Sequence, residues 1–313
     1  MLSSMRSAKS PFIPLLLLIT IGFIAACSSE KGSPGEDVKQ ADASETEDTK
    51  TLDIAHPNSG ELRVLTYNVA GLPEGLSGSH PEANIPVISP LLNAFDLVLL
   101  QEDFWYHGEL KADASHPFQS DPWLTPANIL DMGDGLNRFS LSTFGKLTRT
   151  AWPGCNGDLD CSSDCLATKG FSVARHTLSE GVEVDVYNLH MEAGGCPEDA
   201  VIRAQSVDQL LETLAERSKD VPVIMAGDFN LHEEDPVELA LLNKLLDEGG
   251  LTMACWATEC GASRIDRILV KSHGDVTLEP LSWEIPEEFQ SPAGAPLSDH
   301  DPVAARVRWQ LTR

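Results

Sequence analysis

The sequence predicts an α/β domain built on packed β-sheets that are flanked by helices. Eight short runs rich in Val, Ile and Leu have the length and composition of strands. Only two stretches have the spacing of amphipathic helices, which disfavours a regular series of parallel βαβ units, because such a series needs a helix after nearly every strand. The predicted strands are 62–69, 96–102, 171–178, 182–191, 221–230, 264–270, 276–283 and 302–311.

The two helices are predicted from hydrophobic spacing and from their end signals. In the stretch 199–218, apolar residues recur at the three- and four-residue intervals of one helix face. The stretch 235–250 begins with Asp235 as a candidate N-cap and Pro236 in the first turn, and we expect Gly249 to lie beyond the end of its helix.

The first 26 residues are predicted to be a signal peptide. Arg6 and Lys9 precede an apolar run, and small residues come directly before Cys27. The run falls below the roughly 18 residues that a membrane-spanning helix needs, although a transmembrane anchor stays the alternative. The segment resembles a bacterial lipoprotein signal, which implies that Cys27 carries lipid and becomes the mature N-terminus. We therefore expect a lipid-anchored protein of the bacterial cell envelope, with Ser28 favouring the outer membrane, on its periplasmic side or at the cell surface.

The rest of the chain divides into a tether and one domain. Residues 27–60 are acidic, small and almost free of large apolar side chains, so they cannot bury enough surface to fold. We expect this stretch to be a flexible tether behind the lipidated cysteine. Residues 61–313 contain no second linker of this kind and no internal repeat, and they fall within the size of one large domain.

The charge of the chain is strongly negative. Only 22 Lys and Arg stand against 48 Asp and Glu, which gives a formal net charge of −26. Removing residues 1–26 would take away two basic residues and no acidic ones. Because affinity for a phosphate backbone comes mainly from Lys and Arg, this balance disfavours nucleic acid as a partner and favours cations.

The cysteine count favours disulfides. With Cys27 set aside, six of the seven cysteines remain, and an even number outside the cytoplasm is typical of disulfide bonds. The sequence leaves their connectivity open, although Cys255 and Cys260 in "CWATEC" are the easiest pair to join. A zinc site is the alternative, but the chain has no paired CxxC spacing.

Polar residues stand at or just after the ends of the predicted strands, at positions where a hydrophobic core would take apolar side chains. Carboxylate, amide or imidazole groups end or follow six strand-linked segments, and none of them is a thiol. One such residue alone is usually a turn former or a strand terminus. Six together predict an oxygen-rich site for a hard divalent ion beside a general base. The residues are Asn68, Glu102, His190, Asp228 with Asn230, Asp266, and Asp299 with His300.

The motifs that contain these residues resemble a known family. "TYNVAG", "LLQE", "NLHMEAG", "GDFN", "SRIDRI" and "SDHDPV", in this order, are similar to the endonuclease/exonuclease/phosphatase superfamily of metal-dependent phosphoesterases. "CLATKGFSVAR" and "NLHMEAG" look closest to its neutral sphingomyelinase-like branch. The resemblance covers nearly all of 61–313. It implies two packed, mainly antiparallel sheets in a four-layer α/β/β/α sandwich, with the active site at one end.

The resemblance, together with the chemistry of each group, implies a metal site. Glu102 is expected to be the principal ligand of Mg²⁺, with Asn68 beside it and Asp299 as a further ligand or a carboxylate near the ion. Hard cations take oxygen ligands, and Mg²⁺ often binds through few carboxylates while keeping waters. Mn²⁺ and Ca²⁺ stay open as alternatives.

The same resemblance implies the catalytic groups. His300 is expected to be the general base or to position the attacking water, with Asp266 accepting its other ring N–H. His190 is expected to donate to a non-bridging phosphate oxygen. Asp228 and Asn230, two residues apart in a stretch that we expect to be extended, would point to one face and hold the nucleophile and a phosphate oxygen. Asp301 has no expected role.

The reaction class is predicted more firmly than the substrate. We expect hydrolysis of a phosphodiester, with a phospholipid headgroup favoured by the acidic charge, the lipid anchor and the motif resemblance. An extracytoplasmic nuclease, a small-molecule or inositol phosphate phosphatase and a catalytically silent surface binding protein are the alternatives. Lys169 is a candidate phosphate-binding cation, although a lysine before a turn glycine is more often exposed. Trp283 and Phe289 are expected to pack within the domain in preference to touching lipid. The oligomeric state is not predicted.

Overall fold

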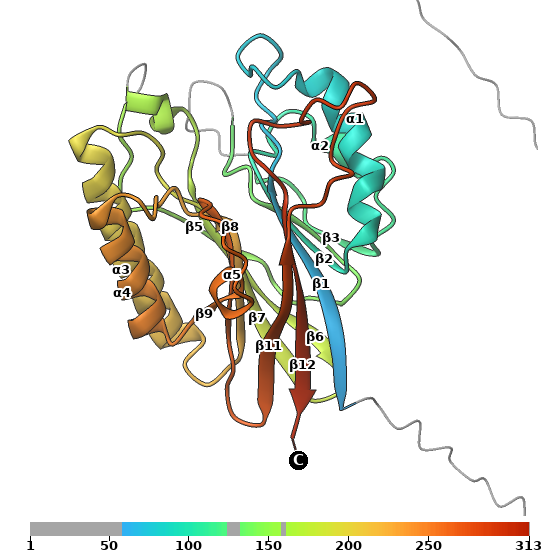
Figure 1. The fold of residues 1–313 in the computed structure, drawn as a ribbon, viewed down its shortest axis with the longest axis vertical. Coiled ribbons are helices and arrows are strands. Elements are labelled where there is room, and N and C mark those ends of the chain that lie inside the picture. Colours follow the sequence, from blue (N-terminus) through green and yellow to red (C-terminus); the bar gives the residue numbers. More distant parts are fainter. Residues whose placement is uncertain (1–57, 124–131, 158–160, 313) are drawn as a thin grey trace, which may run out of the picture. The chain divides into compact units, whose positions relative to one another are not determined.

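Two six-stranded sheets contain the strands of residues 58–123, 132–157 and 161–312, which are the residues described in the computed structural model (Figure 1). The first sheet has the strand order β11 (Val276–Glu284), β12 (Val303–Leu311), β1 (Ser59–Asn68), β2 (Leu97–Gln101), β4 (Asn137–Ser140) and β3 (Phe118–Gln119). The second has the order β5 (Thr148–Ala151), β6 (Gly170–Ser179), β7 (Val182–His190), β8 (Val223–Asp228), β10 (Asp266–Lys271) and β9 (Thr252–Met253).

The pairing within each sheet is mainly antiparallel. Among the described strands, only β1 with β2 and β7 with β8 run parallel, and every other neighbouring pair is antiparallel. The predicted fold class is therefore confirmed, with one parallel pair at the centre of each sheet. The described helical segments are α1 (Pro81–Leu91), η1 (Leu92–Ala94), α2 (His107–Lys111), η2 (Cys161–Leu166), α3 (Pro197–Arg217), α4 (Pro236–Gly249) and α5 (Ala254–Ala257).

Alternation along the central strands produces the layers. In β2, Leu97 and Leu99 face the cluster between the two sheets, whereas Val98 and Leu100 face a second cluster that contains Ile85 of α1. Because both faces of β2 are covered, its sequence is a continuous apolar run and not an alternating one. The domain therefore has the four predicted layers, helix, sheet, sheet and helix.

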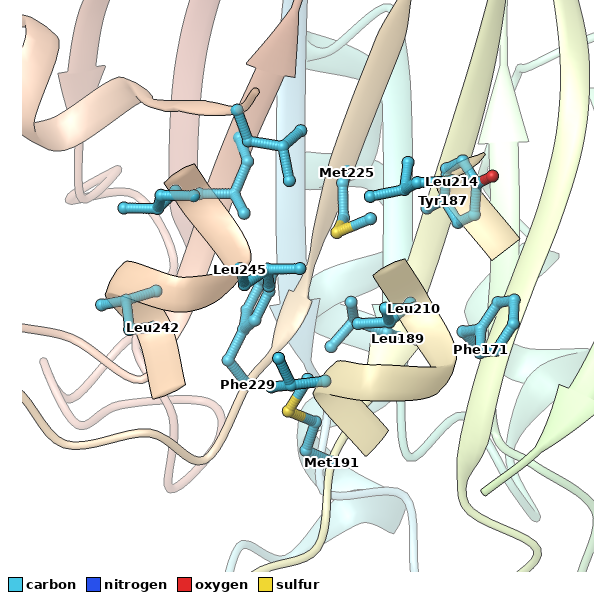
Figure 2. Packing of buried hydrophobic residues seen from close by; sticks show 14 of the residues in the cluster. Phe171, Tyr187, Leu189, Met191, Leu210, Leu214, Met225, Phe229, Leu242 and Leu245 are labelled. Carbon is cyan, nitrogen blue, oxygen red and sulfur yellow. The ribbon is translucent and has the colours of Figure 1, made fainter. Parts of the chain in front are cut away.

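The outer face of the second sheet is covered by α3 and α4. Figure 2 shows Leu210 and Leu214 of α3 and Leu245 of α4 packed against strand residues that include Leu189 and Met225. These side chains are almost fully buried. Each buried Leu of this kind contributes about 1.5–3 kcal/mol relative to an exposed one, so the apolar stripe of the two helices fixes them on the sheet.

The predicted elements are nearly all present. All eight predicted strands exist, and α3 lies where helical spacing placed it. Asp235 caps α4 by accepting from the backbone N–H groups of Val237 and Glu238. Gly249, however, is the last residue of this helix, and Gly250 takes the left-handed conformation beyond it. That position favours glycine because an L side chain is strained there, so the second glycine is the one that ends the helix.

The helix α1 was not predicted. Its sequence "PEANIPVISPL" contains Pro86 and Pro90, which remove helical N–H donors. Ile85 and Ile88 are nevertheless buried against the first sheet, so packing outweighs the local preference.

Several predictions fall outside the described residues. The signal peptide, Cys27 and the tether up to residue 57 belong to this group. The strand β1 begins at Ser59, two residues before the predicted start of the domain. In the described part of the chain, none of the helices has both the length and the apolar character that crossing a bilayer requires.

Candidate active site

The topology brings the predicted polar residues to one end of the two sheets. Two parallel strand pairs, β1 with β2 and β7 with β8, end there, and the antiparallel β10 and β12 begin there. His190, Asp228 and Asp266 are direct neighbours across β7, β8 and β10. The residues at this end are Asn68, Glu102, His190, Asp228, Asn230, Asp266, Asp299 and His300.

Hydrogen bonds between the sheets fix the strands just below this end. The Gln101 side chain donates to Asn188 Oδ1 at 2.7 Å, and the Asn188 amide donates to the carbonyl of Leu100 at 2.9 Å. Both side chains are buried. Because Gln101 precedes Glu102 and Asn188 lies two residues before His190, these bonds set the spacing between the two halves of the site.

Glu102 occupies a turn that only small neighbours allow. Its φ of 54° lies in the left-handed region, which costs energy for a non-glycine residue. A Cβ atom on Gly71 would lie 2.5 Å from the carbonyl oxygen of Glu102, and one on Gly135 would lie 3.0 Å from its Cα. The two glycines therefore let the chain turn sharply after β2 and direct the Glu102 side chain into the site.

Asp228 and Asn230 reach the site by another route than predicted. β8 ends at Asp228, and Asn230 has a φ of 47°, so the stretch is not extended at this point. Its backbone N–H donates to Asp228 Oδ1 at 3.0 Å, and its amide donates to the carbonyl of Met191 at 3.0 Å. Phe229 is fully buried in the helix-facing core, as predicted.

Asp228 is the electrostatic centre of the group. Its Oδ2 atom lies 3.3 Å from Asn68 Nδ2, 3.3 Å from His190 Nε2 and 3.7 Å from His300 Nε2. Burial, together with the negative charge of Asp266, raises the pKa of Asp228 to about 6. His190 is also buried, and burial and the positive charges of Lys169 and His300 hold its pKa well below the usual value.

His300 and Asp266 form the contact that the predicted general base requires. His300 Nδ1 lies 2.8 Å from Asp266 Oδ2. Burial by itself lowers the pKa of His300, but the Asp266 hydrogen bond and the charges of Asp266, Asp228 and Asp299 outweigh it and raise the pKa to about 10. The geometry agrees with the predicted pairing, whereas the catalytic roles stay predictions.

A cavity of about 270 Å³ opens over these residues. Six of the predicted site residues line it, together with Asp164 and apolar side chains from loops that connect to strands of both sheets. The six are Glu102, Lys169, His190, Asp228, Asn230 and His300. Asn68 and Asp266 do not line the cavity themselves. Asn68 donates to Glu102 and Asp228, which line it, and Asp266 contacts His300, which also lines it. The volume is large enough for a phosphate group with part of its substituents.

Lys169 is placed in the cavity by an ion pair that the sequence did not predict. Its side chain is only 8% exposed, and its Nζ lies 2.5 Å from Asp164 Oδ1 and 3.3 Å from the carbonyl of Met191. Asp164 is buried as well and accepts a hydrogen bond from the N–H of Ala193 at 2.8 Å. The common expectation of an exposed lysine is therefore wrong here. The available signal was an acid five residues before the lysine in a cysteine-rich loop.

The two acids beside His300 differ in their surroundings. Asp299 is exposed and does not line the cavity; its Oδ1 accepts from Ser298 Oγ at 3.3 Å. Its charge still acts on Glu102, whose pKa burial raises first and Asp299 raises further. Asp301 pairs with Arg264 at 3.2 Å, so it has a structural contact outside the cavity.

All six expected disulfide cysteines are paired. The bonds join Cys155 to Cys165, Cys161 to Cys196, and Cys255 to Cys260. The prediction of disulfides is confirmed, the easy pair in "CWATEC" is joined, and none of these thiols is left for zinc. The first two bonds enclose the loop that carries Asp164, so they support the end of the domain where Lys169 lies.

The donor groups of the site fit a hard divalent cation. Glu102, Asp228 and Asp266 bring three carboxylates together, and Asp266 Oδ1 is buried without a hydrogen-bond partner among the described residues. Asp228, Asp266 and His300 each offer a ligand atom within 4.8 Å of the others. Buried carboxylates in this number need a compensating positive charge.

Asn68 has an orientation that its predicted ligand role did not include. Its amide nitrogen donates to Glu102 Oε1 at 3.1 Å and to Asp228 Oδ2 at 3.3 Å, while its oxygen accepts from the N–H of Ala70 at 3.1 Å. In this arrangement Asn68 holds the two carboxylates together as a donor. It would ligate an ion only after its amide turned around.

Comparisons with known proteins agree with this geometry. A sequence model described as the Endonuclease/Exonuclease/phosphatase family matches residues 65–300. A sphingomyelinase of Mycobacterium bovis is 35% identical over 276 residues, which cover 80% of this chain and 53% of that protein. The chain thus spans about half the length of the curated relatives it matches.

Solved structures share the fold at low sequence identity. A beta toxin mutant from Staphylococcus aureus with bound magnesium ions is 16% identical, with a TM-score of 0.58 over 81% of this chain and 100% of that one. TDP2 of D. rerio complexed with a single-strand DNA product is 18% identical, with a TM-score of 0.60 over 79% of this chain and 98% of that one. At these identities the likeness shows a shared architecture.

Proposed function

Because the chain belongs to the endonuclease/exonuclease/phosphatase family, we propose that it is a divalent-metal-dependent phosphodiesterase that hydrolyses a phospholipid headgroup, as a sphingomyelinase C does. One observation carries the reaction class. Five segments that are separate in the chain bring carboxylates, imidazoles and a lysine to one cavity of about 270 Å³. A structural role would not need this many buried ionisable groups at a single end of the fold.

The proposed reaction is an in-line attack of water on phosphorus. In its neutral form His300 takes the proton of the attacking water at Nε2, while Asp266 accepts from Nδ1 and keeps the ring oriented. A divalent cation beside these carboxylates would offset the negative charge that raises the pKa of His300, and would so favour the neutral ring. The bond between phosphorus and the leaving oxygen breaks as the new one forms. The leaving oxygen takes up a proton from solvent and His300 returns its proton to solvent, so the products are an alcohol and a phosphomonoester. Asp228 and Asn230 position the water and one phosphate oxygen at the wall of the cavity.

Negative charge on the phosphate is met from two directions. His190 and Lys169 line the cavity and would donate to non-bridging oxygens, where charge must be stabilised during displacement. Bound Mg²⁺, or Mn²⁺ or Ca²⁺ in its place, would supply further positive charge to the phosphate and the leaving oxygen. Glu102 would hold the ion, with Asn68 and Asp299 close to it.

Charge and cavity chemistry support a phospholipid over a nucleic acid. The chain has less than half as many basic as acidic residues. Few Lys and Arg side chains are therefore available to form a continuous basic groove for a phosphate backbone. The cavity also has apolar walls, among them Leu72, Phe104 and Leu166. Relatives named sphingomyelinase are 35% identical to this chain, which supports the same choice.

A substrate panel tests the proposal. The mature protein is assayed with and without a chelator on sphingomyelin vesicles, on bis-p-nitrophenyl phosphate and on supercoiled plasmid, beside His300→Ala. We expect metal-dependent release of phosphocholine and no comparable nicking of the plasmid. Nicking without phosphocholine release would identify a nuclease. Inactivity on every substrate with each metal would instead support a catalytically silent binding protein.

We also propose that the protein is lipid-anchored in the bacterial cell envelope. Support comes from the signal-like sequence before Cys27. The chain enters the described domain at Ser59, and Asn68 lies at the other end of the same strand, roughly 30 Å away at about 3.3 Å per residue. An anchor preceding Ser59 would therefore attach at the end remote from the cavity. Labelling with a radioactive fatty acid, lost in Cys27→Ser, tests the anchor.

A further inference from the structure

Exposed apolar side chains are concentrated at the end of the domain that carries the cavity. Seven large hydrophobic residues are exposed among those the structure describes, and four of them follow strands that end there. Leu76 follows β1 and Trp105 follows β2, while Val201 and Val237 lie near the starts of α3 and α4, which follow β7 and β8. Leu76 is 66% exposed and Trp105 is 57% exposed. Single exposed hydrophobics are common, whereas a gathering around a cavity marks an interaction surface.

Two of these exposed residues and three partly buried ones form an apolar border beside the cavity, here called the apolar lip. Its members are Leu72, Leu76, Phe104, Trp105 and Leu166. All except Trp105 also line the cavity, so the lip is continuous with it. The first four come from two loops of the first sheet, and Leu166 comes from the disulfide-bonded loop of the second. The lip therefore borders the cavity from both sheets.

The two loops that supply most of the lip are bonded to each other. The backbone N–H of Trp105 donates to the carbonyl of Gly71 at 3.2 Å, and the N–H of Glu74 donates to the hydroxyl of Tyr106 at 2.9 Å. The lip is thus held in one arrangement before any partner binds. Such preorganisation lowers the entropy that docking would cost.

We propose that the apolar lip docks on the surface of a neutral, zwitterionic phospholipid bilayer and places the cavity over the headgroups. The inference rests on the proposed phospholipid substrate and names the surface that reaches it. Trp and Leu side chains are the kind that bury in the boundary between headgroups and acyl chains.

The negative charge around the apolar lip favours a bilayer without net charge. The exposed charged residues at this end are mostly acidic, namely Glu74, Glu198, Glu234, Asp235, Glu287 and Asp299. The cations do not offset them, since Lys169 is buried with Asp164 and Arg264 pairs with Asp301. An anionic membrane would be repelled, so docking has to come from apolar contact with a surface that has no net charge.

Two other aromatic residues are excluded from this surface. Phe289 is 3% exposed and meets the ring of Tyr67 at 5.3 Å, edge to face. Trp283 packs against the cores on either side of the second sheet. The expectation that both are packing residues is therefore confirmed, and the lip is left as the apolar surface at the cavity.

Vesicle sedimentation with matched variants tests the inference. All proteins begin at residue 27, as the predicted mature chain does, and carry Cys27→Ser, so that neither the apolar run before Cys27 nor lipid on that residue contributes. Trp105→Ser is compared with Phe118→Ser and Leu141→Ser, which change exposed hydrophobics at the opposite end of the first sheet. We expect Trp105→Ser to weaken binding to phosphatidylcholine–sphingomyelin vesicles about tenfold, the effect of losing one buried apolar side chain. Both control variants should bind as the parent does.

Activity assays separate docking from chemistry. Trp105→Ser should lose hydrolysis of vesicle sphingomyelin while keeping hydrolysis of the soluble bis-p-nitrophenyl phosphate. Leu76→Ser, which also borders the cavity, is assessed by sedimentation alone and should weaken binding similarly. Vesicles enriched in phosphatidylglycerol should bind the parent more weakly than neutral ones.

Three results would overturn the inference: unchanged sedimentation of Trp105→Ser, a preference of the parent for anionic vesicles, or a dimer of the parent that Trp105→Ser dissolves. The last would assign the lip to a second copy of the chain. A parent that sediments with neutral vesicles through Trp105 but hydrolyses no phosphoester would instead retain the docking surface and refute the proposed function.

Discussion

Replacing Asp164 by Asn removes the charge that holds Lys169 in the cavity. The two groups are 2.5 Å apart, and their side chains are 4% and 8% exposed. Taking away one member of a buried ion pair typically costs about 3–5 kcal/mol, and here Glu102 and Asp228 still act on the charge of Lys169. Because Asn can still accept from the N–H of Ala193, we expect the lower end, a loss of about 3 kcal/mol in the free energy of unfolding.

The surface pair of Asp208 and Lys244 provides a matched control. Its Nζ–Oδ1 distance is also 2.5 Å, but its side chains are 58% and 38% exposed. Solvent screens such a pair, so Asp208→Asn should leave the free energy of unfolding nearly unchanged. Urea unfolding followed by tryptophan fluorescence, with the disulfides intact, measures both variants under the same conditions.

The activity of Asp164→Asn tests the second half of the argument. A Lys169 that is no longer held should stabilise phosphate charge poorly, and we expect kcat/KM on bis-p-nitrophenyl phosphate to fall about 100-fold. Asp208→Asn should retain full activity. Equal stability losses in the two variants, or an unchanged kcat/KM in Asp164→Asn, would refute the claim that the buried pair places Lys169.

Further substitutions address other parts of the domain. His300→Ala should lower kcat about 10²–10⁴-fold with unchanged circular dichroism, and full activity would exclude His300 as the general base. Gly227→Ala should destabilise the fold by about 3 kcal/mol or more, since a Cβ there would lie 2.0 Å from the carbonyl oxygen of Leu189 at a φ of 151°; a melting temperature like that of the parent would contradict this. Burial, then the charge of Arg138, lowers the pKa of His176 to about 2. Below about pH 6.5, His176 therefore binds a proton in the unfolded chain but not in the folded one. The free energy of unfolding should then fall by about 1.4 kcal/mol per pH unit between pH 6 and pH 3. His176→Asn should lack this part of the slope in urea unfolding at several pH values, and identical slopes would show that His176 does not titrate on unfolding.

Much of the site was predictable because its residues break the strand pattern. A parallel or doubly covered strand such as β2 has no use for an acid directly after "LVLLQ", so Glu102 stands out. The same reasoning identified His190, Asp228 and Asp266 at the ends of their strands. These side chains lie together because of the sheet topology. The topology was expected because the six motifs, in this order, resemble those of a known family.

Other parts depended on contacts that leave little mark on the sequence. Asp164 lies in an irregular loop between two disulfides, so no periodicity distinguishes it from a solvent-exposed acid. The helix α1 has prolines that oppose it locally and forms because Ile85 and Ile88 cover the first sheet. Asn230 was predicted to lie in the strand, but β8 ends two residues earlier.

The sequence by itself determined the type of fold, the disulfide chemistry and the set of residues that meet at one end of the sheets. The packed sheets follow from alternation along strands and from helical spacing, and the disulfides follow from an even number of cysteines. That the polar residues meet at one end was implied by the resemblance of their motifs to a known family. Only the tertiary structure decided which cysteines pair, that Lys169 is buried against Asp164, that the Asn68 amide points its nitrogen at two carboxylates, and that Leu76 and Trp105 remain uncovered. Each of these depends on distances between segments remote in the chain, and burial and charge act through those distances.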